Sequence, residues 1–589
     1  MAARSRLESR RSRAVSRYLA ASATVQLGES DPSTDPASPF RPVRLKALLV
    51  PPAAQAPHLP DLLHDEAALA LDPHSLNRLL GFAFLSGDAA GAAWGALDQA
   101  AYAPSDHDPN DFVAALFLKD LVAKCFVFQS NGRPAPVHKE HLERLLAQPP
   151  RSAATTAYRQ AIQAELSANA ALPSALGQVY HHLLSLIRLL EDNGKTSRAA
   201  LPRYRLDVLQ ALHRTIESMA NPFQNTVSGL HRLHAFAHYA QSSPGYKDLQ
   251  ALLAFENELS SVQLQVQIGA DGRIRNLQLQ RVAEAEHNPF YVPPWKRWLQ
   301  RIALWLRGYR LGETELVDRW LDQVFAGVSH LLPPLLQLRG DLEFYLGSQH
   351  FRQLAEQANL PLCLPRFAAP EAGGLHLEGL FNPLLLDGSL PPIPCDLQLS
   401  GTLRTTIITG PNSGGKTRLL QALGLCQLLA QAGSYAPAKD GLLGRAQGLF
   451  VSLGEATHVD QSEGRLGTEL LRIRRLFEQA RRGSLVLLDE LCSGTNPSEG
   501  EEIFRLVIEL LNELRPQVFI TTHFLQFAAT LAEPQGSTLP LNFLQVELDA
   551  DDQPTYRFVP GVATTSLANR TAERLGVTRE HLLALIRRT

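Results

Sequence analysis

Thr405-Thr406-Ile407-Ile408-Thr409-Gly410-Pro411-Asn412-Ser413-Gly414-Gly415-Lys416-Thr417 is the stretch that decides the fold of this chain. Its first five residues are all β-branched, which predicts a short buried strand. The next eight have the spacing Gly-x-x-x-x-Gly-Lys-Thr and open a stretch rich in Leu and Ala, which predicts a helix. A strand, a glycine-rich loop and a helix in this order predict a phosphate cradle, in which backbone N–H groups and the helix N-terminus surround phosphate groups.

This loop predicts a site for a nucleoside triphosphate and a divalent cation. Lys416 is expected to reach the β- and γ-phosphates, and the Thr417 hydroxyl is expected to hold Mg²⁺. ATP and Mg²⁺ are therefore the expected cofactors. The candidate nucleotide-binding residues of the loop are Gly410, Pro411, Asn412, Ser413, Gly414, Gly415, Lys416 and Thr417.

Two further apolar strands end in polar residues that suit the same site. The strand Leu485–Leu488 is followed by Asp489 and Glu490. A buried parallel strand delivers such residues to the carboxyl edge of the sheet, beside the phosphates. We expect Asp489 to bind the nucleotide's Mg²⁺ through its water shell and Glu490 to act as general base on the attacking water. A tight polar loop follows at 493–500, and a third strand at 518–521 leads to His523, which is expected to contact the γ-phosphate or the water.

The whole chain is expected to combine a mostly helical N-terminal region with a C-terminal α/β domain. Leu-rich runs at three- and four-residue spacing predict several helices from about residue 61 to 255. Apolar residues alternate with Gln at 262–268, and a Gly-containing turn and a second run at 274–279 complete a predicted β-hairpin. The predicted domains are a basic, partly disordered segment at 1–60, a helical region at 61–365 and an ATPase domain at 366–589.

A basic, Trp-rich stretch at 295–311 predicts an amphipathic helix within the inserted element at about 260–311. Such a helix can meet a nucleic acid, an anionic membrane surface or a partner helix. Alternatively, its Trp face packs on the helical core and its Arg face is solvated. The candidate partner-binding residues are Lys296, Arg297, Arg301, Arg307 and Arg310.

Composition sets few limits on function. The net charge of −2 neither demands nor excludes a nucleic-acid partner. The five cysteines include no C-x-x-C pair, which argues against a disulfide framework or a zinc site and fits a reducing cytoplasm. No apolar run is long enough to predict a membrane-spanning helix. His231, His234 and His238 share one helical face, but without a clear carboxylate partner this pattern favours packing or surface roles over a metal site.

Together, these motifs resemble the MutS family of ABC-type ATPases. The resemblance covers about residues 375–577. Lys416-Thr417 and the loop Asn496-Pro497-Ser498-Glu499-Gly500 are more similar to the paralogues that lack the mismatch-reading domain, so we expect core helices plus an ATPase domain, without that domain or a nuclease-like module. The stretches that carry the resemblance are 409–417, 430–438, 489–500, 522–524, Pro560-Gly561 and 566–576.

The resemblance implies a homodimer in which ATP is sandwiched between two subunits. The family's Ser-Thr-Phe signature, which reaches the γ-phosphate from the partner, is not evident in the corresponding stretch at 462–469. Ser462, Arg465 and Thr468 are the candidates for these trans contacts, with Arg465 as a possible finger. The aromatic residue expected to stack on adenine near Pro392-Ile393 is also missing.

Three functions follow from these expectations. The first is a cytoplasmic dimeric ATPase that couples ATP-driven closure to a grip on double-stranded or branched DNA, in mismatch repair or recombination. The second keeps the ATPase but replaces DNA by a ribosome, an anionic membrane surface or a protein complex. The third is a nucleotide-gated scaffold with little turnover.

Overall fold

The structure is a computed structural model that describes most of the chain from residue 58 onward. The basic helix expected at 295–311, the candidate Ser462 and residues 1–57 lie outside the described residues. The described residues are 58–71, 76, 80, 81, 84, 103–130, 132–191, 201–259, 262–268, 274–282, 313–368, 374–386, 388, 391–399, 404–453, 465–492, 496–533, 539–564 and 579–586.

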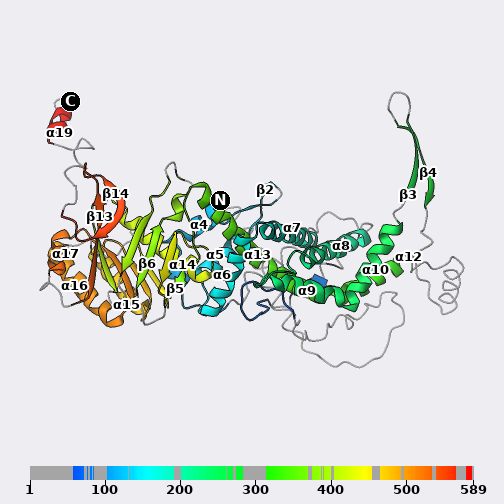
Figure 1. Ribbon diagram of the computed structural model, residues 1–589, viewed down its shortest axis with the longest axis horizontal. Coiled ribbons are helices and arrows are strands. Elements are labelled where there is room, and N and C mark those ends of the chain that lie inside the picture. Colours follow the sequence, from blue (N-terminus) through cyan, green and yellow to red (C-terminus); the bar gives the residue numbers. More distant parts are fainter. Residues whose placement is uncertain are drawn as a thin grey trace, which may run out of the picture. The chain divides into compact units, whose positions relative to one another are not determined.

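Helices dominate the described chain up to residue 357, and their apolar faces meet in one core with a later helix, α14 (Lys416–Ala432; Figure 1). The Leu-rich runs lie on α7 and α8, where Leu183, Ile187, Leu209 and Ile216 are buried. Proline sits at helix ends because it lacks the N–H that an interior position needs, and α10 begins at one. The helices are α4 (Leu118–Cys125), α5 (Lys139–Ala147), α6 (Ala153–Ala168), α7 (Ala171–Glu191), α8 (Leu201–Ala220), α9 (His231–Ser242), α10 (Pro244–Leu259), α12 (Glu313–Val328) and α13 (Leu332–Gln357).

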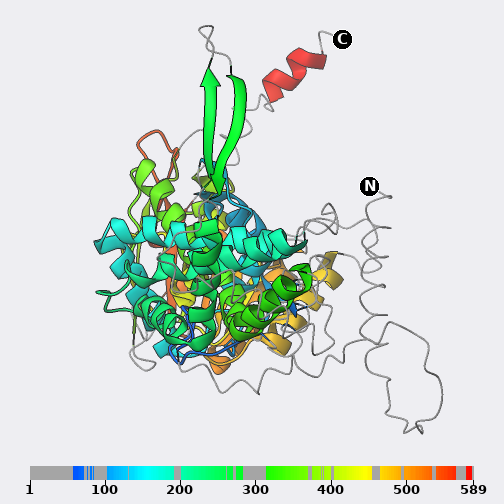
Figure 2. The same ribbon diagram turned by 90° about the vertical axis from the view of Figure 1, so that its right-hand side faces the viewer.

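The helical region also holds two antiparallel hairpins. A short one joins β1 (Gln129–Ser130) to β2 (Arg133–Pro134). The longer one joins β3 (Val262–Ile268) to β4 (Ile274–Val282) and agrees closely with the predicted hairpin (Figure 2). The alternation of apolar residues with Gln at 262–268 therefore predicted strand β3 correctly.

The C-terminal region, from about residue 366, is built on a six-stranded sheet of order β10-β11-β12-β8-β13-β14. The first five strands are parallel, and β14 pairs antiparallel with β13. A smaller sheet has the order β5-β9-β6-β7. The strands are β5 (Arg366–Phe367), β6 (Leu375–Leu380), β7 (Cys395–Leu399), β8 (Thr405–Thr409), β9 (Asp440–Leu443), β10 (Leu449–Ser452), β11 (Leu485–Leu488), β12 (Gln517–Thr521), β13 (Leu541–Leu548) and β14 (Pro554–Pro560).

Both faces of the large sheet are covered by helices, which explains why its central strands are apolar throughout. On β8, Ile408 belongs to the core that α14 (Lys416–Ala432) shares, whereas Ile407 packs with α15, α16 and α17 on the other face. Val486 and Leu487 divide between the two faces in the same way. The remaining helices are α15 (Arg465–Gln479), α16 (Pro497–Leu514), α17 (Leu525–Ala532) and α19 (Arg579–Ile586).

A tight joint connects the end of α14 to helix α6. Gly433 ends α14 with φ +83°, and a Cβ there would lie 2.5 Å from Cβ of Arg159. The Arg159 guanidinium is buried, and its Nη1 donates to Ala432 O at 3.0 Å. Thr156 Oγ1 donates to Gln431 O at 2.9 Å. The helix that leaves the phosphate loop is therefore fastened at its far end to the helical region.

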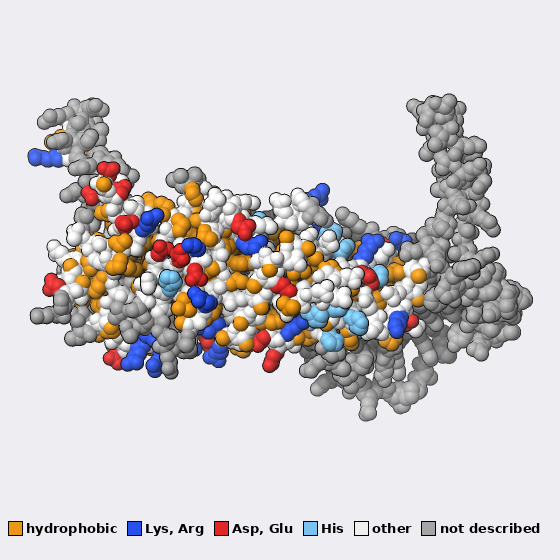
Figure 3. All heavy atoms as spheres, viewed as in Figure 1, with side chains coloured by type: hydrophobic (Ala, Val, Ile, Leu, Met, Phe, Trp, Pro, Cys, Tyr) orange, Lys and Arg blue, Asp and Glu red, His pale blue; other side chains and the backbone are white. Residues whose placement is uncertain are grey.

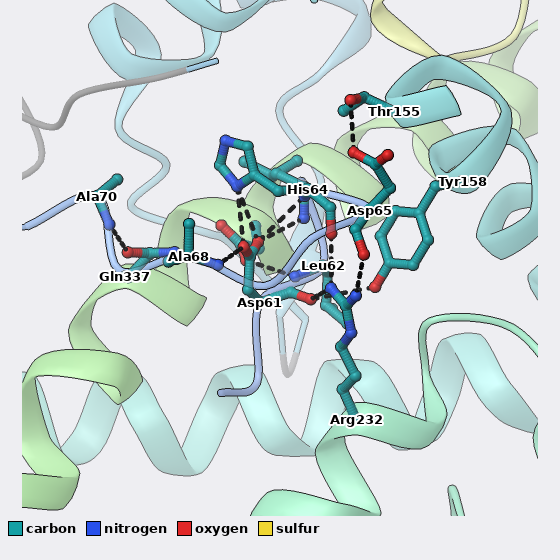
Figure 4. Close-up of polar contacts among 12 residues, drawn as sticks. Asp61, Leu62, His64, Asp65, Ala68, Ala70, Thr155, Tyr158, Arg232 and Gln337 are labelled. Atoms are coloured by element: carbon teal, nitrogen blue, oxygen red, sulfur yellow. Dashed lines mark hydrogen bonds and ion pairs between the residues drawn. The ribbon is translucent and has the colours of Figure 1, made fainter. Parts of the chain in front are cut away.

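The segment 58–71 is not helical, although helices were expected from about residue 61, and it forms a strap across α6, α9 and α13 (Figure 4). The reason is Asp61, whose carboxylate accepts the backbone N–H groups of Leu63, His64 and Ala68. Short polar side chains that bind nearby N–H groups favour turns over helices. The strap also touches the joint, because Arg159 Nε donates to Leu63 O at 2.8 Å.

No helix among the described residues is long and apolar enough to cross a membrane. All five cysteines are unpaired by disulfides, and four of them are buried.

Candidate functional site

The phosphate loop lies where predicted, at the carboxyl end of β8 and the start of α14. Gly410 has φ +140° and Gly415 has φ +84°, conformations that favour glycine. A Cβ on Gly410 would lie 2.6 Å from Val546 Cγ2, and one on Gly414 would lie 2.8 Å from the same atom. These glycines therefore let the loop press against β13, while no side chain caps the N-terminus of α14.

Lys416 is the buried cation of this loop. Only 3% of its surface is exposed, and its Nζ donates to Gly410 O and Pro411 O, both at 3.0 Å. Burial lowers the pKa of Lys416, while the nearby Glu490 and Asp489 carboxylates act to raise it. The two carboxylates thus lie close enough to Lys416 to favour the charged form of its ammonium group.

Asp489 joins three elements at the carboxyl edge of the sheet. It directly follows β11, and 7% of its surface is exposed. Its Oδ2 accepts a 2.7 Å hydrogen bond from Thr417 Oγ1, and its Oδ1 accepts a 2.6 Å bond from Thr521 Oγ1 on β12. The hydroxyl and the carboxylate that were predicted to hold Mg²⁺ thus lie in contact.

Glu490 and His523 flank this pair. The Glu490 backbone has φ +46°, and its N–H donates to Thr521 Oγ1 at 2.8 Å. The Glu490 side chain is half-buried and that of His523 is exposed. The His523 ring lies 4.3 Å, between centroids, from that of Phe524. Both residues follow neighbouring parallel strands, so both belong to the same sheet edge.

The residues present fit a magnesium nucleotide. An ammonium group, an uncapped helix N-terminus and glycines that expose the backbone form a site for anionic phosphates. A hydroxyl in contact with a carboxylate supplies the hard oxygen ligands that Mg²⁺ prefers. Among the described residues, no group of three or more His, Cys, Asp or Glu side chains is arranged to hold a metal ion, and this includes His231, His234 and His238 on α9.

The predicted trans and partner contacts are only partly described. Arg465 and Thr468 lie in the first turn of α15, and Ser462 and the five basic residues at 296–310 lie outside the described part. On the face drawn in Figure 3, the described basic and acidic side chains are interspersed. That face therefore shows no single-signed patch among the described residues.

Thr521 and Tyr556 are among the residues near the site that sequence reasoning missed. Thr521 links Asp489 to Glu490, but only the strand pairing of β11 with β12 brings it there. Tyr556 on β14 has φ +61° and is 46% exposed, and a Cβ on Gly415 would lie 3.2 Å from its Cδ1. An exposed ring therefore stands beside the phosphate loop, whereas Ile393, where the adenine contact was expected, is aliphatic. No local sequence pattern signals that approach.

Comparison with known proteins gives matches in the same part of the chain. Residues 406–580 match the family described as MutS domain V. The "Endonuclease MutS2" of Pelotomaculum thermopropionicum is 32% identical over 283 residues, which is 47% of this chain and 34% of that protein. That of Thermomicrobium roseum is 36% identical over 187 residues, 31% of this chain and 23% of that protein. That of Gemmatimonas aurantiaca is 34% identical over 277 residues, 46% of this chain and 33% of that protein. The matches thus span about a quarter to a third of the length of these relatives.

Proposed function

From the match of residues 406–580 to the family described as MutS domain V, we propose that this chain binds ATP with Mg²⁺ and hydrolyses it to ADP and phosphate. The observation that carries the proposal is the contact of Thr417 with Asp489, backed by Thr521 and adjoining Glu490. A buried lysine, a hydroxyl, and two acids at one sheet edge are the groups that phosphoryl transfer to water requires.

Each residue has a distinct role in this proposal. The Lys416 ammonium and the N-terminus of α14 bind the phosphates, and Thr417 and Asp489 hold Mg²⁺. Held by Thr417 and Asp489, Mg²⁺ would supply positive charge to the phosphate oxygens. Glu490 accepts a proton from the attacking water, and His523 orients that water or the γ-phosphate. Tyr556 offers a ring face to the nucleotide base.

The test compares two variants in steady-state turnover and in equilibrium binding of ATP. Lys416→Ala should lose ATP affinity, because the phosphates lose their cation. Glu490→Gln should keep ATP affinity and lose roughly 100-fold or more in kcat, because only the general base is removed. Glu502→Gln, an exposed acid on α16, is the matched control and should change neither quantity. Turnover that survives Glu490→Gln would contradict the general-base role of Glu490. Wild-type protein that binds ATP with little turnover would favour a nucleotide-gated scaffold instead.

Beyond the chemistry, we propose the predicted domain division at 1–60, 61–365 and 366–589, and a homodimer that grips DNA. In this proposal, ATP binding is coupled to the grip on DNA. The joint between α14 and α6 supports such coupling, because it fastens the helix that follows the phosphate loop to the helical region. ATP bound between two ATPase domains would then draw the helical regions together, with the 462–469 segment acting in trans. A cytoplasmic location stays part of the same proposal.

DNA binding is tested with duplex, mismatched and branched DNA, titrated at several salt concentrations. Phosphate contacts make affinity fall with salt, and reversing the charges of Arg297, Arg301 and Arg307 should reduce the salt dependence as well as the affinity. Ribosomes and anionic vesicles serve as competing partners in co-sedimentation. Sedimentation with either, without salt-sensitive DNA binding, would replace DNA by that partner.

A further inference from the structure

A buried arginine on α15 contacts the backbone that carries the two acids. Arg472 has 9% of its surface exposed. Its Nε donates to Ser452 Oγ, and its Nη2 donates to Ser452 O and, at 3.1 Å, to Asp489 O. Its Nη1 forms an ion pair with Glu469 Oε1 at 3.6 Å. The guanidinium is thus surrounded by partners from β10, from the residue after β11 and from its own helix.

These contacts extend the sheet beyond its last paired residues. Ser452 ends β10 and faces Leu488, the end of β11. One residue further on, Asp489 N–H still donates to Ser452 O at 2.9 Å, and Arg472 is the donor to Asp489 O among the described residues. A charge-assisted hydrogen bond in a buried setting is stronger than a neutral one. The carbonyl is therefore held firmly where the regular ladder stops.

The carbonyl of Asp489 and the N–H of Glu490 belong to the same peptide group, which is planar. Arg472 binds the carbonyl side of this plane, and Thr521 Oγ1 binds the N–H side at 2.8 Å. The orientation of this plane, together with φ of Glu490, sets the direction of the Glu490 side chain. That φ is +46°, a left-handed conformation that is strained for a non-glycine residue, so surrounding contacts must maintain it.

We propose that Arg472 is a positioning residue that orients the Asp489–Glu490 peptide and so aims the Glu490 carboxylate at the attacking water. This inference rests on the proposed hydrolysis of ATP. Among the described residues, the hydrogen bonds and the ion pair of Arg472 reach Ser452, Asp489 and Glu469, and none reaches the phosphate loop. Arg472 therefore acts on the step that Glu490 performs and leaves ATP binding to Lys416.

The experiment measures kcat, the Kd for ATP and the melting temperature of Arg472→Gln. Misplacing a catalytic group by about 1 Å lowers the rate roughly 100-fold, so kcat should fall roughly 10- to 100-fold while the Kd stays within about 2-fold. Arg472→Lys should restore part of kcat, because an ammonium can replace some of the donors but not the planar fork. Arg474→Gln is the control, since this side chain is 75% exposed on the same helix, and it should behave as wild type.

A double variant separates positioning from general damage to the fold. In the Glu490→Gln background, adding Arg472→Gln should lower the residual single-turnover rate by no more than about 2-fold, because the group that Arg472 aims is already removed. A full, additive loss in that background, an unchanged kcat in the single variant, or a parallel loss of ATP affinity would each overturn the proposal. Wild-type protein that binds ATP without turnover would instead defeat the proposed function itself, and with it this inference.

Discussion

The pairing of Asp489 with Thr417 and Thr521 is decided by single side chains at the ends of neighbouring strands. Asp489 uses one carboxylate oxygen for each hydroxyl. The residue types and their order along the chain predicted Thr417 and Asp489 as a pair, because parallel strands end at one edge. The sequence gives no such indication for Thr521 and Arg472, because only the packing of β12 and α15 brings them to Asp489.

A second feature at this scale is His107, whose buried ring has no hydrogen-bond partner among the described residues. It is 6% exposed, neither ring nitrogen is bonded, and the ring stands edge-on to Phe112. Burial lowers its pKa to about 4; Asp106 acts to raise the pKa and Arg445 to lower it further. The folded protein therefore holds this histidine neutral at pH values where an unfolded chain binds a proton.

The pKa of His107 in the folded protein lies below the unfolded value of about 6.5. The contribution of His107 to the unfolding free energy is therefore fully present above pH 6.5 and is lost as the pH decreases towards 4. The expected loss from this group is about 2 kcal/mol by about pH 5 and about 3 kcal/mol by about pH 4. Urea unfolding of wild type and of His107→Leu at several pH values measures it. The difference between the two proteins should shift by these amounts, and a difference that is independent of pH would refute the expectation.

At the scale of elements, the strands of the C-terminal region follow their sequence pattern closely. Thr405–Thr409 and Leu485–Leu488 are strands with the predicted bounds, and β12 starts one residue earlier than expected. Burial on both faces makes such strands short apolar runs, which sequence reveals. The strap was missed, because its turns depend on how one aspartate binds backbone groups.

The joint between α14 and α6 can be tested at Gly433. Gly433→Ala places a Cβ 2.5 Å from Arg159 Cβ on a backbone with φ +83°, so both sterics and conformation oppose it. We expect a loss of about 2 to 4 kcal/mol in unfolding free energy. Gly444→Ala is the control, because a Cβ there meets nothing within 4 Å and the expected change is within about 0.5 kcal/mol. Equal unfolding free energies of the two variants would show that α6 and α14 can move apart at Gly433 at little cost.

At the scale of the whole molecule, the buried polar cluster around the strap connects segments far apart in sequence. Leu62 N–H donates to Asp341 Oδ2 at 2.9 Å, and Tyr345 donates to Leu62 O at 2.6 Å. Arg232 Nη1 donates to Asp61 O at 2.9 Å (Figure 4). Burial and the neighbouring Asp61 raise the pKa of Asp341 well above its usual value. The strap thereby joins helices from three parts of the helical region.

Asp61→Ala removes the acceptor of three backbone N–H groups in this cluster. Leaving one buried and two partly buried donors without their acceptor should cost about 2 to 4 kcal/mol of unfolding free energy, and the strap should become more sensitive to limited proteolysis. Glu66→Ala, an exposed acid in the same strap, should change neither measurement. An Asp61→Ala protein as stable and protease-resistant as the control would mean that the strap does not hold these helices together.

The sequence by itself determined the phosphate loop, the acids after β11 and the resemblance to the MutS family. The match over 406–580 confirms that resemblance. These features are local, because a glycine at a fixed spacing or an acid at a strand end has a direct chemical meaning. Tertiary structure alone decided which side chains support them. Thr521, Tyr556 and Arg472 reach the site from other elements, so their contacts depend on how strands and helices pack and leave no pattern along the chain.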